Sequence, residues 1–149
     1  MSTEDTLQKA RQRAKEMGLP YEGALTPKEA HEVVQQGGAR LVDVRTKAEL
    51  DWVGRVPGAV EVELLQWPGS RPNADFVKQL ESAVPDKNTP LLFLCRSGGR
   101  SHNAAMLAMQ SGYAQTYNVL EGFEGDKDGS GHRNTVGGWR ASGLPWTQS

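Results

Sequence analysis

The sequence predicts an α/β domain of three layers, in which helices cover both faces of a parallel sheet of about five strands. Short apolar runs alternate along the chain with segments whose apolar residues recur at helical spacing. The length of 149 residues suits one compact domain. Apolar residues make up 37% of the chain and charged residues 23%, which is the balance of an ordinary globular protein.

The first helix is predicted over residues 4–17 and ends at Gly18 and Pro20. Its apolar positions are few, namely Leu7, Ala10, Ala14 and Met17. We therefore expect residues 1–20 to form a helical extension that packs only loosely on a domain formed by residues 21–149.

Two further helices have clear start signals. Thr26, a capping residue followed by proline, predicts a helix that ends before Gly37. Residues 46–53 form the next predicted helix, again with threonine at the start. Between these helices the apolar run 41–44 predicts a buried strand.

The second half of the chain repeats this alternation. We expect Asn73 to cap a helix with one apolar face, formed by Phe76, Val77, Leu80, Ala83 and Val84. A turn over residues 86–90 leads into 91–94, the most apolar strand candidate. A helix over 101–111 and a strand over 117–120 complete the predicted sheet. The residues expected to pack from that helix are Ala104, Ala105, Leu107 and Ala108.

Composition excludes several classes of protein. The net charge of −1 gives no basic excess for nucleic acid or anionic membrane, so we expect neither as a partner. No apolar run approaches the roughly 20 residues of a membrane span, and the first residues lack the apolar segment of a secretory signal. We therefore expect a cytoplasmic protein. The single cysteine excludes an internal disulfide and a zinc site of several cysteines.

That cysteine, Cys95, begins the loop that carries the chemistry. It follows the buried strand 91–94 and precedes a helix, and ligands of open α/β sheets bind at this edge. Gly98 and Gly99 let the backbone curl into an anion-binding nest, to which the helix adds its positive end. Arg96 and Arg100 add two positive charges, so we expect the thiol to ionise readily.

Loop length separates two chemistries. Phosphatases and the related arsenate reductases need one more residue in the loop than the four that lie between Cys95 and Arg100. The smaller ring suits a single added sulfur atom better than a phosphoryl group. A cysteine-dependent phosphatase or arsenate reductase is the first alternative, and the loop length argues against it.

Four motifs, in this order, are similar to those of the rhodanese family of single-domain thiosulfate sulfurtransferases, over about residues 22–146. The motifs are 41–45 with Glu49 four residues on, 54–59, 95–101 and 138–145. The resemblance implies the rhodanese-like three-layer fold and a sulfurtransferase activity that needs no metal and no cofactor.

The resemblance also implies a mechanism in which Cys95 is the nucleophile. It takes a sulfane sulfur from a small anionic donor such as thiosulfate, becomes a persulfide, and passes the sulfur to cyanide, a thiol or a protein acceptor. The donor and the persulfide would be held by the rest of the loop, namely Arg96, Ser97, Gly98, Gly99, Arg100 and Ser101. A non-catalytic module that binds a partner is the second alternative, although such modules typically lack the cysteine.

Other residues have supporting roles in this hypothesis. We interpret Asp43, Arg45 and Glu49 as a charge-assisted network that fixes a strand end, rather than as acid–base catalysts. Arg55 stands where the family commonly has histidine, and either alters the choice of donor or forms a surface ion pair.

Residues 123–136 form an extra stretch that simpler members of the family do not have. It is either a wall of the substrate pocket, with His132 and Arg133 as its contacts to an anion, or a glycine-rich surface excursion. Asp126 and Asp128 resemble the start of a calcium loop, but the later glutamate ligand is missing, so we expect no metal site.

Overall fold

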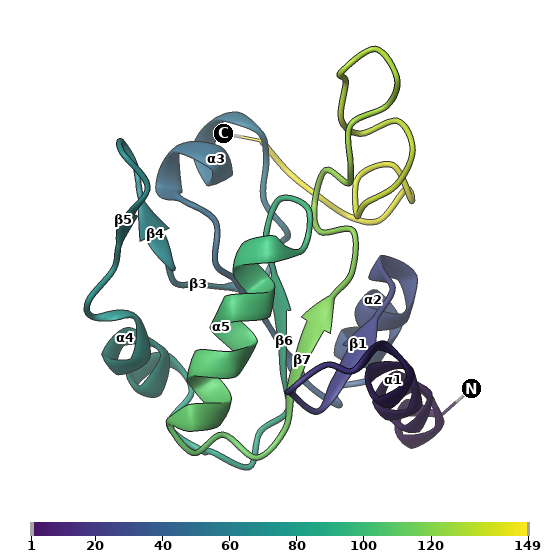
Figure 1. Ribbon diagram of the computed structural model, residues 1–149, viewed down its shortest axis with the longest axis vertical. Coiled ribbons are helices and arrows are strands. Elements are labelled where there is room, and N and C mark those ends of the chain that lie inside the picture. Colours follow the sequence, from purple (N-terminus) through teal and green to yellow (C-terminus); the bar gives the residue numbers. More distant parts are fainter. Residues whose placement is uncertain (1, 149) are drawn as a thin grey trace.

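The computed structural model describes residues 2–148 and shows a parallel sheet with helices on both faces (Figure 1). The five strands lie in the order β1-β7-β6-β2-β3, and every neighbouring pair is parallel. The predicted three-layer α/β architecture is confirmed. The strands are β1 (Gly23–Leu25), β2 (Arg40–Asp43), β3 (Val60–Glu61), β6 (Leu91–Leu94) and β7 (Thr116–Val119).

The helices divide between the two faces. Residues of α4 and α5 belong to one buried cluster, and residues of α1 and α2 belong to the other. The short helix α3 follows β2 in the chain and lies at the end of the sheet toward which β6 and β7 point (Figure 1). The bounds are α1 (Thr3–Met17), α2 (Pro27–Gln35), α3 (Lys47–Trp52), α4 (Phe76–Ala83) and α5 (Gly99–Gln110). None of the helices in residues 2–148 has the length and apolar character needed to cross a membrane.

The central strand β6 explains why this core has two sides. All four of its residues are buried, as its apolar run predicts. Leu91 and Phe93 pack into the cluster of α4 and α5, whereas Leu92 and Leu94 pack into the other. This alternation follows from the two-residue period of a strand. Because β6 ends at Leu94, the residue after it lies at the carboxyl edge of the sheet.

Two predicted helix starts are confirmed in detail. Thr26 and Thr46 each accept a hydrogen bond from the backbone N–H of a glutamate three residues later, and that glutamate accepts one from the threonine N–H in return. Such reciprocal capping satisfies donors that the first turn of a helix leaves free.

Three other helix details differ from the prediction. The N-cap of α4 is Asp75, and Asn73 instead accepts a hydrogen bond from the Asp75 N–H (3.1 Å) in a turn before the helix. The helix α5 begins at Gly99, two residues earlier than expected, because the loop glycines already bend into its first turn. Leu107 was expected to pack but is 39% exposed.

Short strands escaped the sequence analysis. β1 has only three residues, and an antiparallel hairpin of β4 (Leu65–Gln66) and β5 (Arg71–Pro72) lies outside the main sheet. Such segments are too short to show a period.

The expectation that the first helix packs loosely was wrong. Its small residues Ala10 and Ala14 are buried against the domain, and its charged face forms ion pairs of Arg11 with Glu22 (3.3 Å) and of Arg13 with Glu29 (2.7 Å). Few apolar positions are enough here because small side chains let the helix lie close to β1. The division of the chain at residue 20 stays a prediction.

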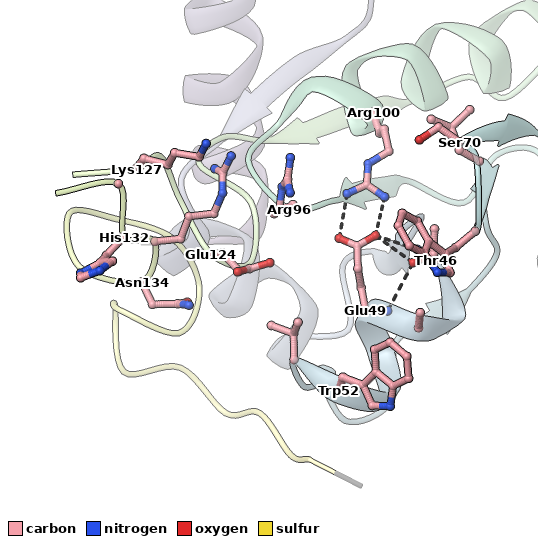
Figure 2. Close-up of a pocket in the computed structure, with 16 residues that line it drawn as sticks. Thr46, Glu49, Trp52, Ser70, Arg96, Arg100, Glu124, Lys127, His132 and Asn134 are labelled. Atoms are coloured by element: carbon pink, nitrogen blue, oxygen red, sulfur yellow. Dashed lines mark hydrogen bonds and ion pairs between the residues drawn. The ribbon is translucent and has the colours of Figure 1, made fainter. Parts of the chain in front are cut away.

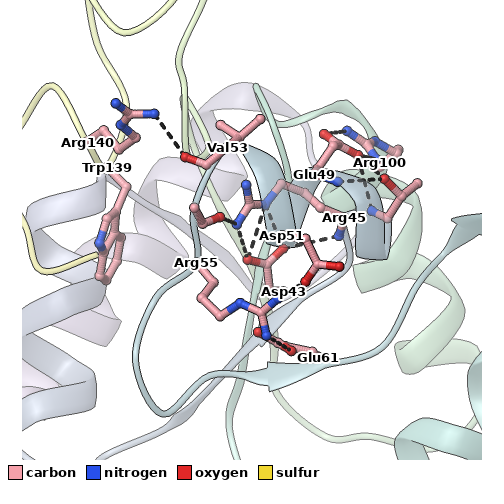
Figure 3. Close-up of polar contacts among 12 residues, drawn as sticks. Asp43, Arg45, Glu49, Asp51, Val53, Arg55, Glu61, Arg100, Trp139 and Arg140 are labelled. Carbon is pink, nitrogen blue, oxygen red and sulfur yellow. Dashed lines mark hydrogen bonds and ion pairs between the residues drawn. The ribbon is translucent and has the colours of Figure 1, made fainter. Parts of the chain in front are cut away.

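A buried ion pair fixes the carboxyl end of β2 (Figure 3). Asp43 and Arg45 are both fully buried, and the Arg45 Nη2 lies 2.7 Å from Asp43 Oδ2. Arg45 Nη2 also donates to the Gly54 carbonyl (2.9 Å), and the guanidinium lies 4.1 Å from the Phe123 ring centroid. The pair therefore joins β2 to the segment after α3 and to the chain beyond β7.

Asp43→Ala should destabilise the protein by about 3–5 kcal/mol, because it leaves the Arg45 guanidinium buried without its carboxylate. Urea unfolding measures this loss. The double variant Asp43→Leu/Arg45→Met removes both charges and should lose much less than the sum of the two single variants. Additive losses would contradict this account of the pair.

Candidate active site

Cys95 lies between β6 and α5 and is only 1% exposed. Its Sγ accepts a hydrogen bond from the Gly98 N–H (3.1 Å) and lies 3.3 Å from the Ser101 Oγ. Gly98 has a φ of +112°, a conformation that favours glycine, and this bend turns its N–H back toward the sulfur. The loop therefore directs one backbone donor, the Gly98 N–H, at the sulfur and places the Ser101 oxygen beside it.

A chain of polar side chains behind the sulfur was not predicted. The Ser101 hydroxyl donates to Asn118 Oδ1 (2.5 Å), and Asn118 Nδ2 donates to the Tyr21 hydroxyl (3.3 Å) and to the Gly98 carbonyl (3.2 Å). The Tyr21 hydroxyl lies 2.7 Å from His102 Nδ1. Asn118 thus holds both Ser101 and the loop in place. An asparagine inside an apolar strand was the signal that could have identified it.

Arg100 forms a bidentate ion pair with Glu49 of α3, at 2.6 and 2.8 Å. Burial of the Glu49 carboxyl raises its pKa, but the Arg100 guanidinium and the Thr46 N–H and hydroxyl outweigh burial and hold this pKa at about 2. The hydrogen bond with Glu49 raises the pKa of Arg100. The pair fixes the end of the Cys95 loop against α3.

The other loop residues differ in exposure. Arg96 is exposed, Ser97 is half-buried, and Gly99 is exposed at the start of α5. Arg96 and Arg100 both line a pocket of about 820 Å³ that opens onto the loop (Figure 2). Cys95 itself does not line this pocket, although it directly precedes Arg96.

The extra stretch 123–136 forms one wall of this pocket, and the role of His132 and Arg133 as contacts to an anion stays a prediction. The residues that it contributes are Glu124, Lys127, Gly131, His132, Arg133 and Asn134. The opposite wall comes from α3 and the β4–β5 hairpin, and includes Trp52, Val53, Leu65, Trp67 and Ser70. Figure 2 shows Lys127 and His132 on one side, Trp52 on another, and Arg96 between them.

Asp128 organises this wall. Its carboxylate accepts hydrogen bonds from the Ser130 N–H (2.9 Å), the His132 N–H (2.9 Å) and the Thr135 hydroxyl (2.8 Å). The hydrogen bond from His132 is the main cause that lowers the pKa of Asp128. Both carboxylate oxygens of Asp128 therefore accept hydrogen bonds from residues of the same loop.

The base of the wall is tied to the Cys95 loop. The Phe123 N–H donates to the Cys95 carbonyl (2.8 Å) and the Glu124 N–H to the Arg96 carbonyl (3.0 Å). Gly122, at a φ of +67°, permits this approach, because a Cβ there would lie 2.6 Å from the Cys95 oxygen.

Glu49 has a different partner from the one expected, and Arg55 forms one of the two arrangements expected for it. Glu49 pairs with Arg100, so it does not share the buried network of Asp43 and Arg45. Arg55 pairs with Asp51 (2.5 Å) and Glu61 (3.2 Å) and does not line the pocket (Figure 3). Of its two interpretations, the surface ion pair is the one that the structure supports.

Comparison with known proteins places this site in a family context. The model of the rhodanese-like domain family matches residues 26–128, a range that contains β2, β6, β7 and the Cys95 loop. An uncharacterized protein of Rickettsia conorii (strain ATCC VR-613 / Malish 7) is 38% identical over 117 residues, which cover 76% of this chain and 87% of that protein. A thiosulfate sulfurtransferase, GlpE of Pseudomonas aeruginosa (strain LESB58), is 28% identical over 100 residues, which cover 67% of this chain and 79% of that protein.

A solved structure extends the similarity. The crystal structure of Rv0390 from M. tuberculosis is 42% identical and superposes with a TM-score of 0.79, over 87% of this chain and 99% of that chain. This agreement in both sequence and shape supports the arrangement of sheet and loop described above.

Gly122→Ala should lower the free energy of unfolding by about 2 kcal/mol or more, because alanine is strained at this φ and its Cβ would displace the Cys95 loop. The reaction of Cys95 with a small thiol reagent should change in rate as well. Gly129→Ala is the matched control, since its Cβ meets open space and its φ is not positive. Equal stability of the two variants would refute the close approach.

The Glu49–Arg100 pair predicts a pH dependence of stability. The pKa of Glu49 is about 2 in the folded protein against an ordinary 4.5, so the stabilisation is complete above pH 4.5 and is lost as the pH falls toward 2. Urea unfolding gives the free energy of unfolding at pH 6 and at pH 3. This free energy should fall less between the two pH values for Glu49→Gln than for the native protein. The exposed Glu32→Gln serves as control and should keep the native difference.

Proposed function

The chain belongs to the family of rhodanese-like domains, and we propose that it is a sulfurtransferase that carries a sulfane sulfur as a persulfide on Cys95. One observation carries the proposal: the Cys95 sulfur sits at the carboxyl edge of β6, with the Gly98 N–H and the Ser101 hydroxyl at 3.1 and 3.3 Å. The similarity to a thiosulfate sulfurtransferase of Pseudomonas aeruginosa supports the same chemistry.

The proposed reaction has two steps. The Cys95 thiolate attacks the outer sulfur of thiosulfate, the S–S bond of the donor breaks, and sulfite leaves with the bonding electron pair. An acceptor then attacks the outer sulfur of the persulfide and releases the Cys95 thiolate. With cyanide the product is thiocyanate, and with a thiol or a protein thiol it is a new persulfide. No electron is gained or lost by the protein over the cycle.

The surroundings of Cys95 fit these steps. The Gly98 N–H stabilises negative charge on the sulfur, and the hydrogen bond from the Ser101 hydroxyl to Asn118 fixes the Ser101 side chain beside the sulfur. Arg96 supplies an exposed positive charge next to the nucleophile, where it can attract an anionic donor. Arg100 is neutralised by Glu49 and therefore acts mainly through the shape of the loop.

Intact-mass measurement after treatment with thiosulfate tests the proposal. The protein should gain the mass of one sulfur atom, and cyanide should remove it with formation of thiocyanate. Cys95→Ser should gain nothing, because Cys95 is the single cysteine of the chain. Phosphatase turnover without any sulfur transfer would overturn the proposal in favour of the phosphatase alternative, and a protein inert toward every sulfane donor would favour a binding module.

A further inference from the structure

Ser101 lies beside the Cys95 sulfur, but its hydroxyl hydrogen points elsewhere. A serine hydroxyl has one hydrogen to donate and two lone pairs with which to accept. Because a carbonyl oxygen can only accept, Ser101 must donate this hydrogen to Asn118 Oδ1, at 2.5 Å. The Ser101 oxygen, 3.3 Å from Cys95 Sγ, can then accept a hydrogen bond from a thiol but has no hydrogen left to donate to a thiolate.

The Gly98 carbonyl fixes the orientation of the Asn118 amide. The Asn118 atom that lies 3.2 Å from this carbonyl must be Nδ2, because two acceptor oxygens would repel each other at that distance. The same Nδ2 donates to the Tyr21 hydroxyl at 3.3 Å. Oδ1 of Asn118 therefore faces Ser101, and the amide cannot turn over without losing the Gly98 hydrogen bond.

Tyr21 and His102 continue the chain of hydrogen bonds in a consistent direction. The Tyr21 hydroxyl accepts from Asn118 and has its own hydrogen for His102 Nδ1, which lies 2.7 Å away. Burial raises the pKa of Tyr21, so the hydroxyl keeps this hydrogen at neutral pH. Ser101, Asn118 and Tyr21 are each no more than 4% exposed, which leaves bulk water little access to these hydrogen bonds.

Turning the Ser101 hydroxyl toward a Cys95 thiolate would break this order. Asn118 Oδ1 would lose its donor, and a buried acceptor without a donor costs free energy that offsets the hydrogen bond gained at the sulfur. The thiol has no such conflict, because it can donate to the Ser101 oxygen while Ser101 keeps its bond to Asn118. The chain of hydrogen bonds therefore favours the neutral thiol over the thiolate.

We propose that Asn118 is a positioning residue that directs the Ser101 hydrogen away from Cys95 and so keeps the resting cysteine in its neutral, less reactive form. The inference rests on the proposed function and concerns the regulation of the same site before a sulfur donor enters. Alkylating agents and oxidants attack the thiolate, so this arrangement protects the single cysteine of the chain between turnovers. The Gly98 N–H remains as the donor to the sulfur when Cys95 ionises.

The charged groups around Cys95 stay the same in every variant of the test. Arg100, whose charge interacts with that of Cys95, is paired with Glu49, and Asp43 is paired with Arg45. Other titratable groups of the neighbouring segments include Arg96, His102, Glu121 and Glu124. A difference in Cys95 ionisation among variants that replace only uncharged residues therefore reports the chain of hydrogen bonds.

The pH dependence of alkylation tests the role of Asn118. Iodoacetamide reacts with the thiolate, so the pH of half-maximal rate reports the ionisation of Cys95. Asn118→Leu leaves the Ser101 hydroxyl free to donate to the thiolate and should lower this pH by about one unit. The Gly98 carbonyl keeps a partner in this variant, because it also accepts from the His102 N–H at 3.2 Å.

Ser101→Ala gives a second test, which also decides the matter should Asn118→Leu fail to fold. It removes an acceptor from the thiol and no donor from the thiolate, so the pH of half-maximal rate should not rise. The double variant Asn118→Leu/Ser101→Ala should match Ser101→Ala, because Asn118 acts through the Ser101 hydroxyl. The S–H stretching band of Cys95, seen by infrared spectroscopy, should move to higher frequency in Ser101→Ala as the thiol loses its acceptor.

Thr116→Val is the matched control. It removes a buried hydroxyl two residues before Asn118 in β7, and Thr116 Oγ1 has no hydrogen-bond partner within residues 2–148, so the native pH profile should persist. Three results would overturn the inference: an unchanged profile in Asn118→Leu, a rise in Ser101→Ala, or an equal effect of Asn118→Leu with and without Ser101→Ala. Alkylation needs no sulfur transfer, so these results leave the proposed function standing. Failure of every sulfane donor to load Cys95 would instead overturn the proposed function.

Discussion

The backbone contact between Phe123 and Cys95 is the constraint on which the site depends. The Phe123 N–H binds the Cys95 carbonyl, and its ring lies against the guanidinium of Arg45. Phe123 is fully buried, and its own carbonyl accepts from the Arg140 N–H at 3.1 Å. One residue therefore joins the Cys95 loop, the buried ion pair at the end of β2 and the chain that follows the extra stretch 123–136. The pocket wall cannot move far without moving the loop.

Two ion pairs of different burial stabilise this arrangement. Asp43 and Arg45 are fully buried, so their attraction is offset by the cost of removing two charges from water, and the pair contributes mainly to geometry. Glu49 and Arg100 are about one-fifth exposed and border the pocket, where they remain partly hydrated. The first pair positions the strand end, and the second holds the last residue of the Cys95 loop against α3.

The sequence predicted the features that depend on local chemistry. Continuous apolar runs identified β2 and β6, threonine caps identified the starts of α2 and α3, and the glycines after Cys95 identified the bend that turns the Gly98 N–H toward the sulfur. Pairings that depend on tertiary structure were missed. Glu49 was grouped with Arg45, four residues away, but it binds Arg100 because α5 begins beside α3. Asn118 was hidden in the same way, since β7 meets the Cys95 loop only in the folded sheet.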